Sequence, residues 1–576
     1  MYNLLDQFKE IWLVDFEFIA DDRSGEMPTP VCLSARELRT GRQHLLWQDE
    51  FGLEPPPYDI LPSSLFVSYY ATAELKCHQV LGWKQPARVL DLWCEFKNHT
   101  NGRHPLNGRG LLGAMAYYGL GAINTTEKTE MRDMVLRGGP WSPEERTAIL
   151  QYCKTDTDAL ARLLPAMLKD IDFPRALLRG RYMSAVSAME ANGTPIDIEL
   201  LSRLVKNWEI IQEKLIAEVD AEYGVYEGRS FRQERFEQWL IKNDIGWPRL
   251  ESGKLALASD TFEEMSEIYP QVTKLRKLRQ ALGEMRLSDL AVGADGYNRC
   301  PLSPFTSMTG RNQPSNTKFI FGPGSWMRCL IKPKEGMAVA YLDWEQQEFG
   351  IAAGLSGDSN MRKAYESGDP YLAFSKQAKA VPQDATKKSH PEIRELYKRC
   401  ILGTQYGQES ESLARKIQRP EYEARELLRL HREVYKVFWG WSDNSVDHTV
   451  LSGKQQTVFG WTHYVTPDFN SRSLRNFFMQ GNGAEMLRLA CCLGTENGIA
   501  VCAPVHDALL IMAPTERIDE DVARMRGYME EASKVVLAGF ALRTEAVVVR
   551  YPDRYIDKRG KDFWNKIVNL LPCGVG

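Results

Sequence analysis

Over about the first 170 residues, short apolar runs alternate with stretches in which apolar residues recur at helical spacing. Buried or half-buried strands are predicted at 10–20, 63–71 and 87–93, where β-branched and aromatic residues cluster. A long helix is predicted to begin at Pro143, because Ser142 and Glu145 have the spacing of a capping box. Strands alternating with helices indicate an α/β domain, and we expect its boundary near 172–178.

The remainder of the chain predicts a more helical architecture. Apolar residues recur at helical spacing in 198–222 and 261–288 and through most of 357–450, whereas Gly, Pro, Ser and Asn dominate a predicted loop at 300–330. A hairpin at 453–468 and a helix at 483–498 are also expected.

Two acids interrupt apolar segments in this second part. Asp343 ends a predicted strand at 336–343, and Asp507 lies with His506 between two short apolar arms at 502–512. A hairpin with Asp507 at its turn would expose the carboxylate and avoid the cost of burying it unpaired. If the two strands are neighbours, Asp343 and Asp507 could hold two Mg²⁺ ions, which prefer carboxylate and phosphate oxygens.

Composition narrows the class of protein without identifying a partner. The 576 residues are 43% hydrophobic and 26% charged, which is typical of a globular chain of about two to four domains. No apolar run is long enough to span a bilayer and no signal peptide is recognised, so we expect a cytoplasmic protein. The net charge of −4 gives no sign of a nucleic-acid partner.

A second group of acids is predicted in the N-terminal domain. Asp15 and Glu17 share one face of a strand, and Tyr152 and Asp156 share one face of the capped helix, with Glu74 between them in sequence. Four converging carboxylates would repel one another unless divalent metal ions bound them, and two such ions suit phosphodiester cleavage. Each motif alone is common in proteins without such a site.

A stripe of unusual composition lies on the predicted helix near residue 400. Arg394, Lys398, Leu402 and Tyr406 follow at intervals of four, so they share a slowly drifting face. Two cations, a hydrophobe and an aromatic ring suit a ligand that is anionic at one end and flat at the other. A nucleoside triphosphate is such a ligand.

The acids of the N-terminal domain, in this order, resemble the DnaQ-like 3′→5′ exonucleases, which have an RNase H-like fold. The resemblance implies metal ligands at Asp15, Glu17, Glu74 and Asp156, with Tyr152 positioning the attacking water. The family usually has Asn and Asp where this chain has Tyr70 and Glu74.

The second part of the chain resembles the family A DNA polymerases. "YLDWEQQEFGIAAGLSGD" is similar to their motif A, "RELYKRCILGTQYG" to motif B and "PVHDALL" to motif C. "TGRNQPSN" (309–316) and "RNFFMQGNGAEML" (475–487) are similar to segments that contact DNA, and "MEANGTPID" (189–197) to the segment that opens the polymerase domain.

The polymerase resemblance implies a role for individual residues. Asp343 and Asp507 would hold two Mg²⁺ ions, for which Mn²⁺ could substitute, while Lys398 would neutralise the triphosphate and Arg394 would grip its γ-phosphate. The dNTP site would also include Leu402, Tyr406, Gln346 and Glu348, the last excluding a ribose 2′-hydroxyl. Contacts with primer–template DNA are implied for Arg311, Arg472, Asn476, Gln480 and His506.

Several positions depart from the polymerase pattern. Leu402 stands where an aromatic residue is usual, Glu345 replaces Ser, Gly350 replaces Arg, and Ala508 replaces the Glu after the motif C aspartate. We therefore expect Asp343 and Asp507 to act without a third acid beside them.

The combined resemblance implies a multidomain α/β enzyme of bacteriophage type, in the host cytoplasm if viral. We expect an exonuclease domain at 1–175 and a right-hand polymerase at 176–576, with thumb at about 190–300, palm at about 301–356 and 440–576, and fingers at about 357–439. The expected function is replicative DNA synthesis from dNTPs with 3′→5′ proofreading. We expect the protein to act as a monomer, which a processivity or replisome factor could assist.

Two alternatives to this function remain at the level of sequence. One is a DNA-binding 3′→5′ exonuclease whose polymerase half is silent, and the other is a catalytically silent replication scaffold. Both acids of the polymerase half and both cations of the helical stripe are present, which argues against either alternative.

Overall fold

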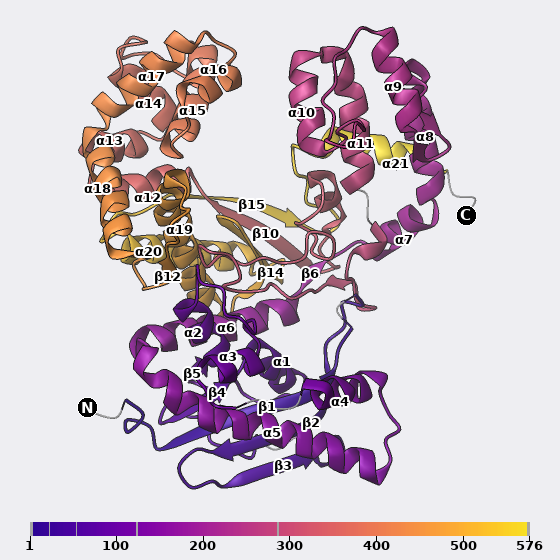
Figure 1. The fold of residues 1–576 in the computed structure, drawn as a ribbon, viewed down its shortest axis with the longest axis vertical. Coiled ribbons are helices and arrows are strands. Elements are labelled where there is room, and N and C mark those ends of the chain that lie inside the picture. The colour runs from indigo at the N-terminus through magenta and orange to yellow at the C-terminus, as the bar shows by residue number, and fades with distance from the viewer. Residues whose placement is uncertain (1–3, 22, 53–54, 122–124, 285–286, 573–576) are drawn as a thin grey trace.

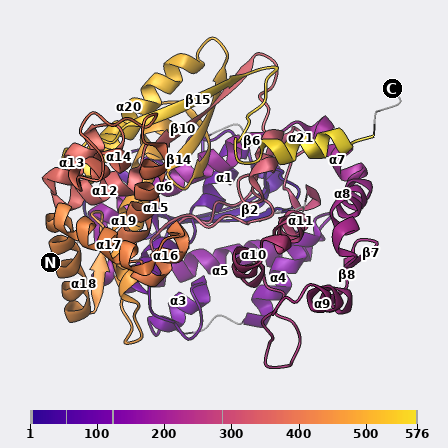
Figure 2. The same ribbon diagram turned by 90° about the horizontal axis from the view of Figure 1, so that it is seen from above.

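The computed structural model describes residues 4–21, 23–52, 55–121, 125–284 and 287–572. Two helical lobes rise from a central antiparallel sheet, and a domain with its own sheet lies on the other side of the molecule (Figure 1). The two lobes remain apart when the molecule is viewed from above (Figure 2). Within the described ranges, no helix has the length and apolar character needed to cross a membrane.

The N-terminal domain is built on a five-stranded sheet of order β3-β2-β1-β4-β5. Strand β1 runs antiparallel to β2 but parallel to β4, and helix α1 provides the crossover that the parallel neighbours β4 and β5 require. Helix α5 packs across β1 and β2. The elements are β1 (Glu10–Ile19), β2 (Thr29–Glu37), β3 (Gln43–Trp47), β4 (Ser64–Ser68), α1 (Thr72–Val80), β5 (Val89–Asp91), α2 (Leu92–His99), α3 (Leu111–Tyr117), α4 (Thr125–Arg137) and α5 (Pro143–Met167).

The central sheet is four-stranded and antiparallel, in the order β13-β14-β10-β15. Ala340 and Leu342 of β10 are fully buried, whereas Tyr341 and Asp343 alternate with them and are half-buried, so one face of this strand remains accessible. Helix α20 packs on β10, β14 and β15. The elements are β10 (Met337–Trp344), α12 (Gln347–Ser356), α19 (Ser471–Glu496), β13 (Ala500–Val505), β14 (Ala508–Pro514), α20 (Ile518–Val536) and β15 (Thr544–Arg550).

The two lobes are helical, as their periodicity predicts. The lobe at the left of Figure 1 contains α13 (Ser359–Glu366), α14 (Pro370–Gln377), α15 (Pro391–Gln405), α16 (Ser410–Ile417), α17 (Glu421–Val434) and α18 (Lys436–Ser452). The lobe at the right contains α7 (Ile198–Lys206), α8 (Trp208–Tyr223), β7 (Tyr226–Glu227), β8 (Ser230–Phe231), α9 (Gln233–Lys242), α10 (Ser259–Ile268) and α11 (Thr273–Glu284), with α21 (Lys561–Leu570) against α8.

The N-terminal domain is joined to the centre by helix α6 (Phe173–Asn192) and by the hairpin of β11 (Lys454–Gln456) and β12 (Thr462–Tyr464). Arg179 of α6 forms a buried bidentate ion pair with Glu95 of α2, with N···O distances of 2.6 and 2.7 Å. Asn101 donates to the carbonyls of Met308 and Thr462 at 2.7 and 2.8 Å. The short pair β6 (Thr194–Pro195) and β9 (Tyr297–Asn298) closes the base of the right lobe.

Most predicted elements are confirmed. The capping box at Ser142 and Glu145 is present, the hairpins at 453–468 and 502–512 form, and the predicted strands at 10–20, 63–71 and 336–343 correspond to β1, β4 and β10. The loop predicted at 300–330 ends in a short 3₁₀ helix, Ser325–Leu330.

The structure gives the start of a helix at one predicted boundary and moves the start of one predicted helix, while the division into domains stays a prediction. The predicted boundary at 172–178 is the beginning of α6, because Pro174 occupies its first turn, where a missing N–H costs nothing. The helix predicted at 483–498 begins at Ser471. Gly481 and Gly483 do not interrupt it because they allow close packing: a Cβ at either position would lie 2.7 Å from Thr457 or Gln347.

The ion pair between Arg179 and Glu95 yields a prediction about stability. Removing one partner leaves an uncompensated buried charge, which costs roughly 3–5 kcal/mol. We expect Arg179→Met to lower the free energy of unfolding by roughly that amount, and Arg179→Met with Glu95→Leu to recover most of it. Urea unfolding of the single and double variants measures both values. Equal losses in the two variants would contradict the prediction.

A buried histidine in the left lobe yields a pH-dependent prediction. Burial lowers the pKa of His431 to about 3, and its Nδ1 accepts from Trp439 Nε1. In the unfolded chain the pKa of the same side chain is about 6.5, so below that pH the unfolded chain binds a proton that the folded chain does not. This binding lowers the free energy of unfolding by about 2 kcal/mol between pH 6.5 and 5. We expect His431→Gln, which keeps an acceptor, to lose less stability over this interval than wild type. Exposed His104→Gln is the control and should match wild type.

Candidate active sites

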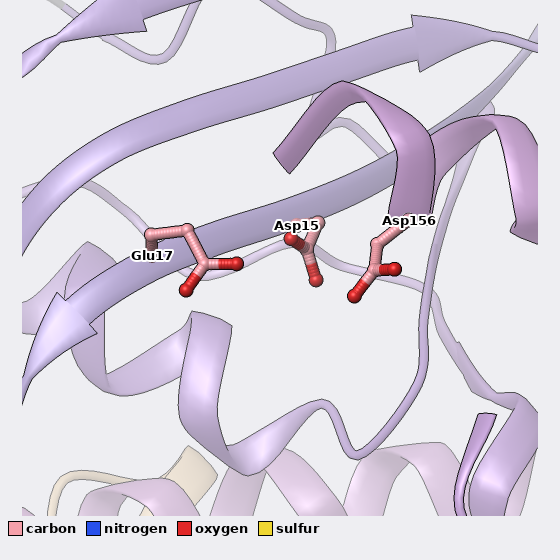
Figure 3. Close-up of side chains that lie close together, drawn as sticks. All are labelled: Asp15, Glu17 and Asp156. Carbon is pink, nitrogen blue, oxygen red and sulfur yellow. The ribbon is translucent and has the colours of Figure 1, made fainter. Parts of the chain in front are cut away.

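The first candidate site lies on one face of β1, the middle strand of the N-terminal sheet. Asp15 and Glu17 project from β1 toward Asp156 of α5, and one carboxylate oxygen from each lies within 4.8 Å of the others (Figure 3). The two-residue spacing on a strand and the packing of α5 on β1 bring these three acids together, as the sequence predicts. Carboxylate oxygens at this spacing suit a hard divalent cation.

Tyr152 and Glu74 lie close to this acidic cluster, and neither is one of its three acids. Burial, and then the charge of Asp156, raise the pKa of Tyr152, so its hydroxyl remains a hydrogen-bond donor at neutral pH. Glu74 is buried in α1 and is not among the three acids that converge. Burial, and then the charge of Asp15, raise its pKa well above the usual range. The predicted role of Glu74 as a ligand stays a prediction.

One acid of this region was not singled out from the sequence. Asp91 caps α2 and accepts hydrogen bonds from the backbone N–H groups of Ala71 and Cys94 at 2.7 and 2.8 Å. Burial raises its pKa to about 6 despite those hydrogen bonds. Because Ala71 precedes α1, Asp91 fixes the segment that carries Glu74. The signal in the sequence was an Asp at the end of an apolar run.

The second candidate site is created by the register of the central sheet. Asp343 of β10 is directly opposite Ala508 of β14, and the Trp344 N–H donates to the Asp507 carbonyl at 3.2 Å. Asp507 occupies the tight turn between β13 and β14, where His506 adopts a left-handed conformation with φ of 56°. The two acids predicted to share a site therefore lie side by side.

The electrostatics of this pair favour a positive partner. Burial, and then the charge of Asp507, raise the pKa of Asp343 to about 7, and burial also raises the pKa of Asp507. Within the described ranges, no hydrogen-bond partner reaches the buried Asp343 Oδ1. These two carboxylates fit the oxygen-rich, anionic donor set that Mg²⁺ requires.

The expectation that no third acid accompanies the pair is wrong. Glu545 of β15 is directly opposite Asp343, so the two side chains share one face of the sheet, and Glu545 is among the charges that raise the pKa of Asp343. Ala508 removes the usual acid of motif C, but the neighbouring strand supplies another that no sequence motif marks.

Helix α15 carries the predicted cationic stripe, with Arg394, Lys398 and Leu402 on the helix and Tyr406 at its C-cap. Arg394 Nε lies 2.5 Å from a carboxylate oxygen of Asp369, the N-cap of α14. Lys398 is half-exposed, and only the weak pair with Glu395 at 3.9 Å engages its ammonium within the part of the chain that the structure describes. Both cations are thus near the surface of the lobe.

Two positions of motif A that depart from the family pattern, Glu345 and Gly350, lie close to residues just before β15. Arg543, which precedes β15, donates to Glu345 at 3.1 Å and to the Gln346 side chain at 3.4 Å. A Cβ at Gly350 would lie 2.5 Å from Leu542, so that space is already filled. Gly350 stands where the family usually has Arg and carries no charge, whereas Arg543 places a cation beside motif A.

Glu348 connects this motif to the segment that carries Arg311 and to α15. Its carboxylate lies 3.6 Å from Arg311, and its carbonyl accepts from Gln405 Nε2 at 2.7 Å. Asp507 is among the charges acting on both Arg311 and Glu348. Glu348, predicted to line the nucleotide site, and Arg311, predicted to contact DNA, thus meet beside Asp507.

A groove of about 710 Å³ adjoins the acids, and Arg311, Gln480 and His506 are among its lining residues. The other two predicted DNA contacts are not among the residues that line it. Arg472 pairs with Glu409 of the left lobe at 3.1 Å, and Asn476 lies one turn before Gln480 on α19. The structure therefore gathers three of the five predicted DNA residues in one groove.

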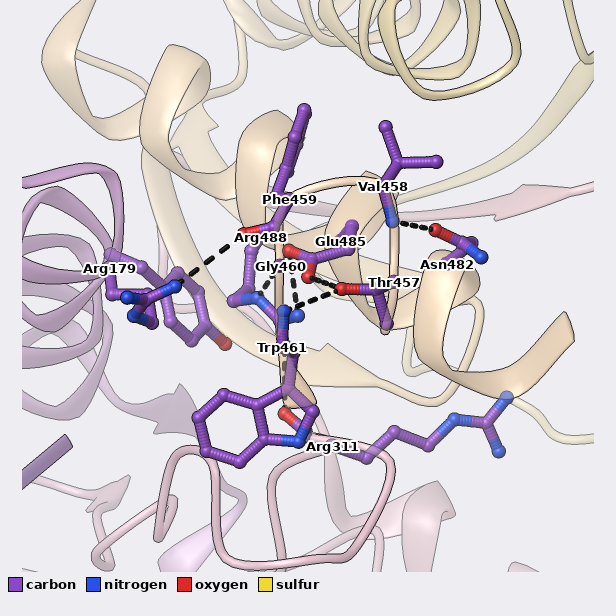
Figure 4. A network of polar contacts seen from close by, with 12 residues as sticks. Arg179, Arg311, Thr457, Val458, Phe459, Gly460, Trp461, Asn482, Glu485 and Arg488 are labelled. Carbon is purple, nitrogen blue, oxygen red and sulfur yellow. Dashed lines mark hydrogen bonds and ion pairs between the residues drawn. The ribbon is translucent and has the colours of Figure 1, made fainter. Parts of the chain in front are cut away.

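A buried polar network fixes the loop that carries Arg311 (Figure 4). Arg488 of α19 donates to the Gly310 carbonyl at 2.6 Å and pairs with Glu485 at 2.8 Å. Glu485 accepts in turn from the Thr457 hydroxyl at 2.6 Å. Sequence reasoning missed this network, because Gly310 and Thr457, which bond to Arg488 and Glu485, are distant from α19 in the chain.

Comparison with known proteins agrees with this geometry. The model of DNA polymerase family A matches residues 317–548. A thermostable DNA polymerase I of Thermus aquaticus is 27% identical over 378 residues, which are 60% of this chain and 44% of that protein. A DNA polymerase I of Aquifex aeolicus is 25% identical and a DNA polymerase of Mycobacterium phage L5 is 23% identical, covering 72% and 65% of those proteins.

A solved structure shows how far the fold extends beyond the matched segment. The POL domain of Pol1 from M. smegmatis, in complex with a DNA primer-template and dNTP, superposes with a TM-score of 0.70 at 17% identity. The superposition covers 93% of this chain and 95% of that one. Residues 317–548 therefore match the model of DNA polymerase family A, and the chain shares its fold with this POL domain.

Proposed function

We propose that this protein performs template-directed DNA synthesis, adding dNTPs to a primer 3′ end. The observation that carries the proposal is the meeting of Asp343 and Asp507 on paired strands beside a groove lined by Arg311, Gln480 and His506. The relatives named as DNA polymerases, and the shared fold of a POL domain solved in complex with DNA primer-template and dNTP, support it.

Each predicted residue takes a part in this proposal. Asp343 and Asp507 would hold Mg²⁺, which when bound supplies positive charge for the primer 3′-oxygen and the triphosphate. Arg394 would exchange Asp369 for the γ-phosphate, and Lys398 would neutralise the remaining phosphate charge. Leu402, Tyr406 and Gln346 would border the incoming nucleotide.

Glu348 and the groove residues would select and align the substrates. The Glu348 side chain, held near Arg311, would occupy the space that a ribose 2′-hydroxyl needs and so favour deoxynucleotides. Arg311, Gln480 and His506 would contact the primer terminus from the groove, with Asn476 and Arg472 farther along α19. The division into palm, fingers and thumb belongs to the same proposal.

We further propose that the N-terminal domain removes nucleotides from a DNA 3′ end. Asp15, Glu17 and Asp156 would hold a divalent cation, and the protonated Tyr152 hydroxyl would orient the attacking water. Glu74, with its raised pKa, would act through a hydrogen bond or through water. The convergence of three acids from β1 and α5 supports this activity.

The polymerase proposal predicts the effect of removing either acid of the central sheet. We expect Asp343→Ala and Asp507→Ala each to reduce primer extension by roughly 100-fold or more, because the lost cation stabilisation amounts to several kcal/mol. A primed template with Mg²⁺ and dNTPs measures the rate. Exposed Glu516→Gln is the matched control and should extend at the wild-type rate. Undiminished extension in Asp343→Ala would contradict the role given to this acid, whereas a wild-type protein that does not extend primers would favour the DNA-binding nuclease or the silent scaffold.

The exonuclease proposal predicts a separable loss of activity. Asp15→Ala with Glu17→Ala should abolish primer shortening without dNTPs while leaving extension with dNTPs intact, because the two sites occupy different sheets. Asp21→Ala, an exposed acid in the loop after β1, should shorten primers normally. Shortening that persists in the double variant would contradict the assignment.

A further inference from the structure

The segment after β15 returns across the central sheet to the catalytic acids. The Tyr555 N–H donates to the Ile331 carbonyl at 3.0 Å, and Arg554 donates to the Cys329 carbonyl at 3.0 Å. The Tyr555 ring lies 5.5 Å from that of Tyr341, which is two residues before Asp343 and on the same face of β10. Residues 554–559 are thus anchored beside the active site.

A buried carboxylate in this segment holds two arginines. Asp557 is 6% exposed and accepts from Arg328 at 2.8 Å and from Nε and Nη2 of Arg559 at 3.0 and 2.7 Å. Two cations on one anion leave a local positive charge. The Arg559 side chain is 72% exposed, and within the described part of the chain no hydrogen-bond acceptor engages its Nη1. Asp557 therefore aims the guanidinium while leaving part of it available.

Two observations place Arg559 next to the groove and the acids. The Arg328 guanidinium lies 5.4 Å from the centre of the Phe321 ring, and Phe321 lines the same groove as Arg311 and His506. The positive charge of Arg559 is also among those that lower the pKa of both Asp343 and Asp507.

The position of Arg559 in the fold separates it from the cations of α15. Arg559 lies two residues before α21, which is on the side of the right lobe, whereas α15 belongs to the left lobe. The two helices remain apart in both views (Figures 1 and 2). If Arg394 and Lys398 bind the triphosphate, Arg559 on the other side of the site is left to contact the second substrate, which is the primer strand.

We propose that Arg559 binds a backbone phosphate of the primer strand within the last few nucleotides before its 3′ end, with Asp557 and Arg328 positioning it. A guanidinium matches the geometry of a phosphate, and its bidentate pair with Asp557 fixes its orientation before DNA arrives. This inference rests on the proposed polymerase function, since it requires a primer terminus at Asp343.

The first test compares Arg559→Gln with Lys558→Gln, which removes the same charge from the exposed neighbouring residue. Fluorescence anisotropy with a primer–template duplex should show about 10-fold weaker binding for Arg559→Gln. Its slope of log Kd against log salt should fall by about one phosphate contact. Arg559→Lys should recover part of the affinity, while Lys558→Gln should remain near wild type. Equal losses in the two Gln variants would overturn the proposal, because they would reflect charge alone.

The second test locates the phosphate. Primers carrying a neutral methylphosphonate at one of the last four linkages are bound to wild type and to Arg559→Gln. We expect one linkage at which the neutral group weakens wild-type binding but not binding by the variant, which is the signature of a direct pair in a double-mutant cycle. Additive effects at all four linkages would overturn the proposal.

Wild-type binding separates failure of this inference from failure of the proposed function. A wild-type protein that binds primer–template no better than single-stranded DNA would contradict the polymerase proposal itself. A wild-type protein that prefers the primer terminus, together with an Arg559→Gln variant of equal affinity and salt slope, would overturn only the role of Arg559.

Discussion

The antiparallel pairing of β10 with its two neighbours is the constraint on which the site of Asp343 and Asp507 depends. This register places Asp343 opposite Ala508 and Glu545, so three segments distant in the chain deliver acids to one small area. A shift of one residue would turn Asp343 to the face covered by α20. The buried apolar residues of β10 and β14 resist such a shift, because a slip would also expose them to water.

The same pairing brings charged residues close to positions at which the sequence departs from the polymerase pattern. Glu545 brings an acid to the place that Ala508 leaves without one, and Arg543 brings a cation to motif A where Gly350 cannot. Glu545 is in β15 and Arg543 directly precedes that strand. Strand β15 pairs with β10 on the side opposite to β14, which follows the Asp507 turn. Charge near Asp343 and Asp507 is therefore a property of the sheet rather than of any one motif.

A second constraint connects the two halves of the molecule. The β11–β12 hairpin receives hydrogen bonds from Asn101 of the N-terminal domain and contributes Thr457 to the network that holds the Arg311 loop. A Cβ at Gly102 would lie 2.0 Å from the Tyr464 carbonyl, so the two parts meet at backbone contact distance. The loop that carries Arg311 and the N-terminal domain thus both contact the β11–β12 hairpin.

Periodicity and local spacing determined the elements and much of the chemistry of this protein. The strands carrying Asp15 and Asp343, the hairpin at Asp507 and the stripe on α15 follow from patterns within a few residues, since strand and helix repeats fix which side chains share a face. Tertiary structure alone decided that Glu74 stays outside the acidic cluster, that Glu545 joins Asp343 and that Asp557 aims Arg559. Those relations join residues from separate elements, and the free energy that fixes them comes from burial and pairing across the fold, which no local pattern encodes.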